Sequence, residues 1–289
     1  MNSNIVADLS NQTAIITGGS GLIGGVYTSA LLQSGANVII IDKKINKTKF
    51  LEQLKKENKG ITMNFNNLNF FECDITNPKY VKQIFKKIKP HLSNLKILIN
   101  NASLVKQVKN TSDLISTYKS FEKMNPNDWE EYISVDITGS LLVIQQAIPF
   151  MKKNQGGSIV NISSTYGILS PDQKLYEIFN KKLSKKEKDL GIKIEKPIGY
   201  SISKSGVLNM TRFLATKFAD DNIRVNTLTL GGVYDNNPSG FVKEYSKRTH
   251  LGNMADKTQY AGPLLFLVSE MSSYMTGSNL IIDGGWSAW

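Results

Sequence analysis

Cysteine and histidine are scarce in this chain, and their scarcity excludes several kinds of site. Cys73 is the only cysteine among 289 residues, so the chain can form neither an internal disulfide nor a zinc site built from several cysteines. A reducing compartment, the cytoplasm, is therefore the expected location. The two histidines, His91 and His250, lie outside the motifs described below, and the sequence predicts no metal site.

Long apolar runs are also missing. No segment approaches the ~18 apolar residues that a bilayer-spanning helix needs. The first dozen residues lack the basic start and apolar stretch that are typical of an export signal. The sequence therefore predicts no membrane partner.

Arginine is rare, although the chain is basic. The formal net charge is +11, yet only three of the 35 basic residues are arginine. Proteins that read nucleic acids usually rely on arginine forks and aromatic platforms, whereas these lysines are scattered among acids and asparagines. The pattern favours a solvated lysine-rich surface and no nucleic-acid partner, and it leaves an attraction for small anionic molecules open.

Seven short apolar segments alternate with amphipathic stretches along the chain. Several are apolar throughout, as expected for strands covered on both faces. This alternation predicts an α/β fold of the Rossmann type, a doubly wound parallel sheet of about seven strands with helices on both faces. Because no repeat or linker interrupts the pattern, the whole chain is interpreted as a single domain. The expected strands are residues 13–17, 37–41, 68–72, 95–100, 158–163, 224–230 and 279–282, and the expected helices lie at about 21–34, 44–58, 77–90, 126–153, 199–220 and 256–270.

Two polar connections break this rhythm. Residues 103–125 follow the fourth expected strand, and residues 170–198 form a lysine-rich insert before the helix expected at 199–220. Long connections in a compact domain are usually functional lids or disordered segments. We expect the insert near the substrate pocket, where its lysines would suit a phosphorylated or carboxylated substrate. An exposed charged loop is the alternative.

A glycine-rich turn joins the first expected strand to the first helix. Glycines there allow a tight turn and close approach to a pyrophosphate, which the free N–H groups of the helix N-terminus would bind. A plain tight turn is the alternative when a glycine cluster is taken alone. The predicted cofactor contacts in this turn are Gly18, Ser20, Gly21, Leu22 and Ile23.

Asp42 ends the second expected strand, 18 residues after Gly24. A carboxylate at that point accepts hydrogen bonds from the 2′-hydroxyl of an adenosine ribose and repels a 2′-phosphate, which favours NAD over NADP. Lys43 and Lys44 follow immediately and weaken this discrimination, so NADP is the alternative cofactor. Asp42 could instead cap the next helix.

Tyr200 and Lys204 stand four residues apart at the start of an expected helix and so share one face. A lysine ammonium near a tyrosine hydroxyl stabilises the phenolate, and the pair could then exchange a proton with a substrate oxygen. Chance produces about one such pair in a chain of this composition. A surface helical pair is therefore the alternative, and the position of the pair decides between them.

These motifs follow one another along the chain in the order that is typical of a known protein family. The chain resembles the short-chain dehydrogenase/reductase family over nearly its whole length, and eight motifs carry the resemblance. They are the turn at 17–24, Asp42, Cys73–Ile75, Asn100–Ser103, Ser163–Ser164, Tyr200–Lys204, Arg224–Asn226 and Thr276–Gly277 with Asp283–Gly285.

The resemblance implies a role for each of these residues. Tyr200 would be the general acid/base, Lys204 would hold the nicotinamide ribose, and Ser164, rather than Ser163, would bind the reacting oxygen. Asp74 would meet the adenine amino group, or alternatively cap the following helix. The other implied cofactor contacts are Ile75, Asn101, Ala102, Gly231 and Val233, of which Asn101 is also explained as an ordinary turn residue.

The chain departs from the family pattern in several places. Asp136 stands where an asparagine of the proton relay is common, and it is a candidate catalytic residue because a carboxylate could still order a water. Leu22 replaces a frequent glycine, and Leu230 and Ser103 replace a usual proline and glycine. The insert separates Ser164 from Tyr200 by 36 positions. None of these changes removes the groups that hydride transfer needs.

The predicted function is therefore an NAD(P)-dependent oxidoreductase that transfers a hydride between nicotinamide and a secondary alcohol or ketone. The segments 232–236 and 283–289 resemble oxidoreductases of bacterial flagellin and surface-polysaccharide sugar pathways. This implies a small-molecule substrate, a sugar or an anionic sugar derivative. The alternatives are a 3-ketoacyl-thioester reductase and a non-catalytic NAD-binding regulatory or RNA-associated protein.

The family resemblance also implies self-association as a homodimer or homotetramer. The helices expected at 126–153 and 199–220 would form a four-helix contact between subunits. Apolar residues on these helices could serve either that contact or the sheet. They are Leu141, Leu142, Ile144, Val207 and Phe213.

Overall fold

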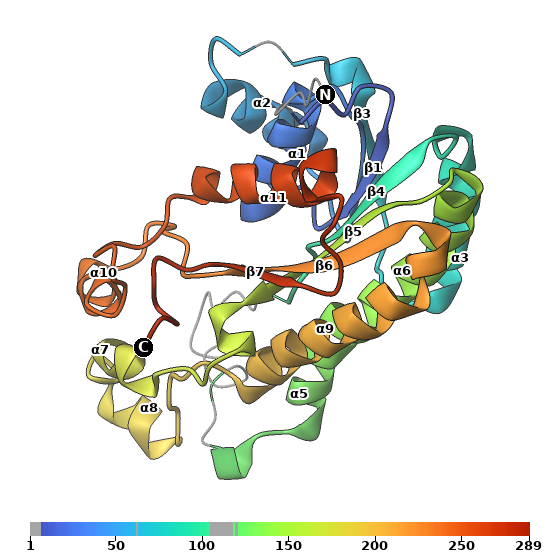
Figure 1. Ribbon diagram of the computed structural model, residues 1–289. Coiled ribbons are helices and arrows are strands. Elements are labelled where there is room, and N and C mark those ends of the chain that lie inside the picture. Colours follow the sequence, from blue (N-terminus) through green and yellow to red (C-terminus); the bar gives the residue numbers. More distant parts are fainter. Residues whose placement is uncertain (1–6, 62, 105–117, 119–120) are drawn as a thin grey trace.

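A computed structural model describes residues 7–61, 63–104, 118 and 121–289. Its seven strands form one parallel sheet in the order β3-β2-β1-β4-β5-β6-β7 (Figure 1). This confirms the predicted fold class, and all seven strands lie where the apolar segments predict them. The strands are β1 Thr13–Thr17, β2 Asn37–Asp42, β3 Leu68–Glu72, β4 Leu95–Asn100, β5 Gly157–Ser164, β6 Ile223–Leu230 and β7 Asn279–Ile282.

Helices cover both faces of the sheet. Three helices pack on one face, where Figure 1 shows α1 and α11 above the strands. Three helices also pack on the other face, and α5 leads into one of them. On the first face lie α1 Leu22–Gln33, α2 Lys47–Glu57 and α11 Ala261–Val268, and on the second lie α3 Pro78–Ile88, α5 Pro126–Ile133, α6 Ser140–Lys153 and α9 Ile198–Lys217.

The two cores follow from the alternation of side chains along each strand. In β1, Ala14 and Ile16 pack with the α1 face, whereas Ile15 packs with the α6 face, and all three are fully buried. Each large aliphatic side chain buried in this way contributes about 1.5–3 kcal/mol of hydrophobic stabilisation. Apolar residues at consecutive positions are therefore required, which is why these strands are apolar throughout.

The helix expected at 126–153 contains a wider turn. Residues 134–139 adopt π-helical geometry between α5 and α6. A π-turn inserts an extra residue into the helical ladder and is frequent at functional sites. Here the turn contains Asp136, which is almost completely buried and turned toward α9. Hydrophobic periodicity does not reveal such an insertion, so the sequence predicted one uniform helix.

By length and composition alone, the stretch Pro126–Lys153 could cross a membrane, with a mean hydropathy of 1.3 over its most apolar window. Its apolar face is used inside the fold, because Val143, Ala147 and Met151 are buried against the strands. Core helices of α/β proteins share this composition, so the stretch is weak evidence for a membrane span.

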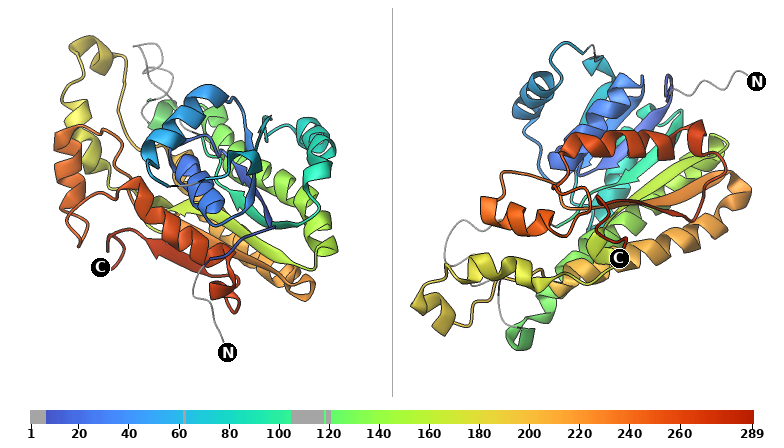
Figure 2. Two further views of the ribbon diagram at one scale, coloured as in Figure 1. Left: turned by 90° about the horizontal axis from the view of Figure 1, so that it is seen from above. Right: turned by 60° about the vertical axis from the view of Figure 1, so that its left-hand side comes forward.

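Three short helices at the carboxyl end of the sheet were not predicted. They are α7 Glu177–Asn180, α8 Lys185–Asp189 and α10 Ser239–Ser246. Figure 2 shows the insert (yellow) and α10 (orange) beside each other at one end of the molecule. Elements of four to eight residues are too short to show periodicity. Most of the expected connection at 103–125 lies outside the described residues.

Candidate active site

A cleft of ≈ 1040 Å³ lies at the carboxyl edge of the sheet. It is lined by the ends of β1, β2, β4, β5 and β6 and by part of the insert. The strand order reverses between β1 and β4, and ligands of doubly wound sheets bind at such a switch point. The eight-residue pairing of β5 with β6 ends at Ser164 and Leu230, which places both at this edge.

The glycine turn fits a dinucleotide phosphate. Gly18 has φ +64°, and a Cβ on Gly24 would lie 2.1 Å from the carbonyl oxygen of Gly18, so neither position accepts a side chain. Gly21 precedes α1 and provides no side-chain cap. The N–H groups of the first turn therefore keep their capacity to bind an anion. Leu22 and Ile23 line the cleft at this point.

Asp42 lines the cleft at the end of β2, and Ser20 holds its carboxylate. The backbone N–H and hydroxyl of Ser20 donate to Oδ2 of Asp42 at 3.2 and 2.6 Å. Ser20 thus lies behind Asp42 and is not part of the cleft lining. Asn46, not Asp42, caps α2, so the helix-cap alternative for Asp42 is wrong.

Asp74 lies beside Asp42 and is engaged on both oxygens. Lys43 Nζ lies 2.7 Å from Oδ2, while the N–H and hydroxyl of Thr76 donate to Oδ1. Burial raises the pKa of Asp74, but these hydrogen bonds outweigh it and leave that pKa below its ordinary value. The cap of α3 is Asn77, which excludes that role for Asp74. Ile75 lines the cleft next to it.

Cys73 lines the same end of the cleft but is nearly buried. Burial, followed by the neighbouring Asp74 carboxylate, raises the pKa of the Cys73 thiol to about 11. A thiol in that environment stays protonated at neutral pH and is a poor nucleophile. Cys73 is therefore a packing residue.

Asn101 ties the end of β4 to the glycine turn. Its Nδ2 donates to the carbonyl oxygens of Thr17 and Gly18 at 3.1 and 3.0 Å. The N–H of Ala102 donates to the hydroxyl of Thr17, and a Cβ on Gly18 would lie 2.8 Å from Cα of Ala102. Asn101 and Ala102 therefore shape the turn and also line the cleft.

The two candidate serines are used differently. The hydroxyl of Ser163 is buried and donates to the carbonyl oxygen of Lys204 at 2.8 Å, which joins β5 to α9. Ser164 is half-buried, and its Oγ accepts one bond, from the N–H of Tyr166 at 3.2 Å. Ser164 thus keeps a hydroxyl proton to donate, and it lines the cleft.

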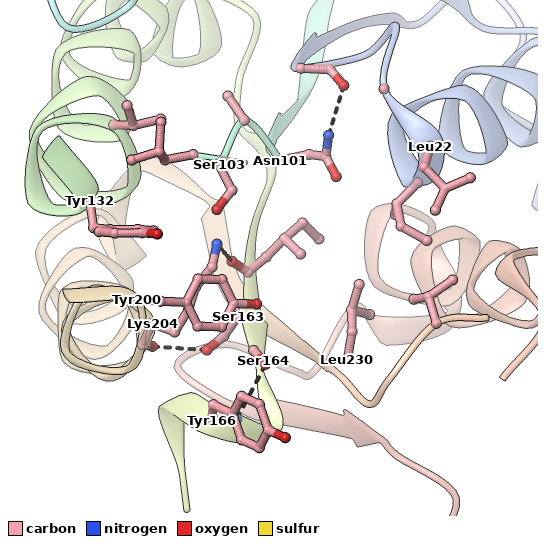
Figure 3. A pocket seen from close by; sticks show the side chains of 18 of the residues that line it. Leu22, Asn101, Ser103, Tyr132, Ser163, Ser164, Tyr166, Tyr200, Lys204 and Leu230 are labelled. Atoms are coloured by element: carbon pink, nitrogen blue, oxygen red, sulfur yellow. Dashed lines mark hydrogen bonds between the residues drawn. The ribbon is translucent and has the colours of Figure 1, made fainter. Parts of the chain in front are cut away.

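Tyr200 and Lys204 are on the first turns of α9 and line the same cleft as Ser164 (Figure 3). The Lys204 ammonium is buried, donates to the carbonyl oxygen of Ile162 at 3.2 Å, and lies 5.8 Å from the ring centroid of Tyr200. The structure therefore excludes a surface helical pair. It brings Ser164 together with Tyr200 and Lys204, which lie 36 and 40 positions further along the chain.

Asp136 lies behind Lys204 and outside the cleft lining. Its Oδ2 is 3.6 Å from Lys204 Nζ and accepts the hydroxyl of Ser203 at 2.5 Å. Its Oδ1 is buried, and no described residue bonds it. Asp136 contacts the cleft through Lys204, so the geometry gives it a supporting position.

The segment after β6 is fixed by aromatic residues that the sequence analysis missed. Gly231 and Val233 line the cleft, and the N–H of Gly232 donates to the hydroxyl of Tyr245 at 2.5 Å. Trp286 stacks on Tyr245 with ring centroids 4.5 Å apart. The C-terminal motif 283–289 therefore supports this side of the cleft through Trp286.

Five aromatic side chains and one lysine form the outer part of the cleft. Tyr176 and Phe179 come from the insert and contact Phe241 of α10 at centroid distances of 5.9 and 5.7 Å. These residues come from separate connections, so no spacing in the sequence signals their meeting. We call five of the rings the aromatic wall: Tyr166, Tyr176, Phe179, Phe241 and Tyr245. Lys196 lies among them, and Tyr118 and Tyr132 also line the cleft.

Family models match most of the chain. A family described as short chain dehydrogenase matches residues 12–176. A second model, described as Enoyl-(Acyl carrier protein) reductase, matches residues 191–287.

Several known proteins are similar to the chain over nearly their whole length. Post-translational flagellin modification protein A of Campylobacter coli is 27% identical, covering 96% of this chain and 99% of that protein. 3-oxoacyl-[acyl-carrier-protein] reductase FabG of Thermotoga maritima is 30% identical, covering 96% and 98%. D-arabinitol 2-dehydrogenase [ribulose-forming] of Scheffersomyces stipitis is 30% identical, covering 99% and 98%.

A solved structure shares the arrangement. The short chain dehydrogenase from Leptospira borgpetersenii, described with bound NAD+, superimposes with a TM-score of 0.76 at 28% sequence identity. The match covers 96% of this chain and 93% of that one.

Proposed function

The chain belongs to the short-chain dehydrogenase/reductase family, and from this premise we propose that its substrate is a sugar or sugar derivative of surface-glycan biosynthesis. The class of reaction follows from membership of the family: the protein is an NAD(P)-dependent oxidoreductase that acts on CH–OH groups. The observation that carries the proposed reaction is the convergence of Tyr200, Lys204 and Ser164 at the switch-point cleft.

The proposed chemistry assigns one task to each of these side chains. Tyr200 takes the hydroxyl proton of the alcohol as general base. The buried ammonium of Lys204 stabilises the negative charge on the phenol oxygen. Ser164 donates its free hydroxyl proton to the substrate oxygen and holds it beside Tyr200. In the direction of ketone reduction, Tyr200 returns the proton.

The cleft has suitable donors and acceptors for the whole dinucleotide. The first turn of α1 would hold the pyrophosphate, Asp42 the adenosine ribose, Asp74 the adenine, and Gly231 to Val233 the nicotinamide amide. When bound, the nicotinamide supplies the acceptor for the hydride of the substrate carbon. The role of the protein is to position and polarise the substrate.

Two relatives support the choice of a sugar substrate. One is named as a flagellin modification protein and another as an arabinitol dehydrogenase. The aromatic wall of the cleft fits this choice, because aromatic rings offer flat apolar faces against which the C–H face of a sugar ring can pack.

A panel assay tests the proposed function. We expect NAD+ to be reduced, measured by NADH absorbance, with at least one polyol, sugar, amino sugar or sugar phosphate. A purified enzyme that binds NADH but oxidises no member of the panel would contradict it. Because one relative is an oxoacyl reductase, acetoacetyl thioester with NADH or NADPH is included, and exclusive turnover of that compound would favour the thioester alternative.

The proposed preference for NAD depends on Asp42. Asp42→Ala is expected to raise the ratio of kcat/KM with NADP to kcat/KM with NAD by about tenfold, since the variant no longer repels a 2′-phosphate and Lys43 remains. Steady-state kinetics with both cofactors measure the ratio. Glu52→Ala, an exposed change on α2, is the control. A wild-type enzyme that already prefers NADP would refute the interpretation of Asp42.

We also propose a cytoplasmic homodimer or homotetramer. The single thiol is buried, as suits a reducing compartment. Among the apolar helix residues, Ile144 packs in the core on the sheet and Val207 is buried, whereas Leu141 and Phe213 are 38% and 63% exposed. The exposed pair supports a contact between subunits across α6 and α9.

A further inference from the structure

Among the lysines of the insert, Lys196 is the one that lies against Tyr200, the proposed general acid/base. Its Nζ lies 3.7 Å from the ring centroid of Tyr200 and 6.0 Å from that of Tyr166. Among the described residues, the other lysines of the insert do not line this cleft. Those of the run 181–188 are exposed to solvent on the short helices.

The insert holds Lys196 firmly by its backbone. The side-chain amide of Gln173 accepts the N–H of Lys196 at 2.9 Å and donates to its carbonyl oxygen at 3.1 Å. Asn180 binds both backbone groups of Ile194 in the same way, each at 2.8 Å. These two clamps fix the backbone of residues 194–196 immediately before α9, at the place from which the Lys196 side chain reaches over the ring of Tyr200.

The ammonium of Lys196 has no carboxylate partner among the described residues. The acids near it are already engaged: Glu195 pairs with Lys193, and Asp172 accepts Nε of Arg248 at 2.7 Å. Asp136 is buried and faces the ammonium of Lys204. A half-buried cation facing aromatic rings, with its charge unneutralised, is a favourable place for an anion.

From this arrangement we infer that Lys196 binds a negatively charged group of the substrate, a carboxylate or a phosphate, next to the carbon that reacts at Tyr200. The inference rests on the proposed function and narrows its substrate class to anionic ring alcohols. The aromatic wall holds the ring, Lys196 holds the charge, and Ser164 with Tyr200 holds the reacting oxygen. Substrates without the charge lose one of these three points of attachment.

Binding to the enzyme saturated with NADH tests the inference without turnover, because the bound cofactor fills its own phosphate site. Calorimetry compares two matched pairs of probes: cyclohexanecarboxylate with cyclohexanecarboxamide, and glucose 6-phosphate with glucose. We expect the wild-type enzyme to bind the charged member of one pair about tenfold or more tightly than its neutral partner. The pair that shows the preference identifies carboxylate or phosphate as the group.

Lys196→Met keeps the apolar stem of the side chain and removes its charge. This variant is expected to bring the charged-to-neutral affinity ratio close to one, whereas Lys196→Arg retains the preference. A general change in the shape of the cleft would alter the affinities for both members of a pair alike, so it cancels in their ratio. Lys188→Met, an exposed change in the same insert, is the matched control and keeps the wild-type ratio.

Two results would overturn the inference: no charge preference in the wild-type enzyme, or a preference that survives in Lys196→Met. Failure of the proposed function gives a different result. An enzyme that oxidises only neutral alcohols refutes the anion site and leaves the function standing. An enzyme that oxidises no alcohol, but shows a Lys196-dependent preference for an anion, refutes the function and leaves the site.

Discussion

Tyr200→Phe is expected to lower kcat by about 10²–10⁴-fold, the contribution that general acid/base catalysis typically makes. The substitution removes one oxygen atom from a ring that lies beside Lys204 and Lys196, so the packing of the cleft is retained. The affinity for NADH, measured by fluorescence titration, is expected to stay close to that of the wild-type enzyme. Loss of turnover with retained cofactor affinity is the signature of a lost proton-transfer group.

Tyr274→Phe makes the same chemical change on a tyrosine that is fully exposed. It is expected to leave both kcat and NADH affinity unchanged, which controls for handling and purity of the variants. If Tyr200→Phe turned over the substrate at the wild-type rate, another group would have to be the acid/base, and the assignment would fail.

Much of the fold and the inner part of the cleft could be predicted from the sequence, for a physical reason. Parallel strands buried on both faces must be apolar throughout, and their carboxyl ends meet at one edge. Residues that end such strands, such as Asp42 and Ser164, or directly follow one, such as Asn101, are therefore predicted to lie at that edge. The helical spacing of Tyr200 and Lys204 places the pair on one face in the same way.

The outer part of the cleft could not be predicted, because no periodic pattern in the sequence indicates which side chains form it. Phe179, Phe241 and Trp286 belong to the insert, to α10 and to the C-terminal segment. Tertiary packing alone brings them into one cluster, in which Tyr245 joins Trp286 to Phe241. Composition suggested that the insert is basic, but a count of lysines does not tell which ammonium faces the cleft. In the structure, Gln173 and Asn180 hold the backbone of the segment at the place where the ammonium of Lys196 faces the cleft.

Asp136 shows a second limit of sequence reasoning. The family resemblance offered a water-ordering role, because the residue stands in place of an asparagine. In the structure its carboxylate lies 3.6 Å from the Lys204 ammonium and binds Ser203, within a π-turn that the sequence did not reveal. The carboxylate of Asp136 thus compensates the charge of the buried Lys204 ammonium. We therefore expect its removal to lower the free energy of unfolding measurably.

Asp136→Ala is expected to destabilise the fold by about 3–5 kcal/mol, the usual cost of leaving one member of a buried ion pair without its partner. Lys204 would keep its bond to the carbonyl oxygen of Ile162 but lose its compensating charge, and the hydroxyl of Ser203 would lose its acceptor. Urea denaturation followed by circular dichroism measures the free energy of unfolding.

Asp136→Asn keeps an acceptor for Ser203 at the same place and is expected to lose less stability. Glu52→Ala, an exposed acidic residue on α2, is expected to change stability by no more than about 0.5 kcal/mol. If Asp136→Ala were as stable as that control, the pair with Lys204 would contribute nothing to the fold.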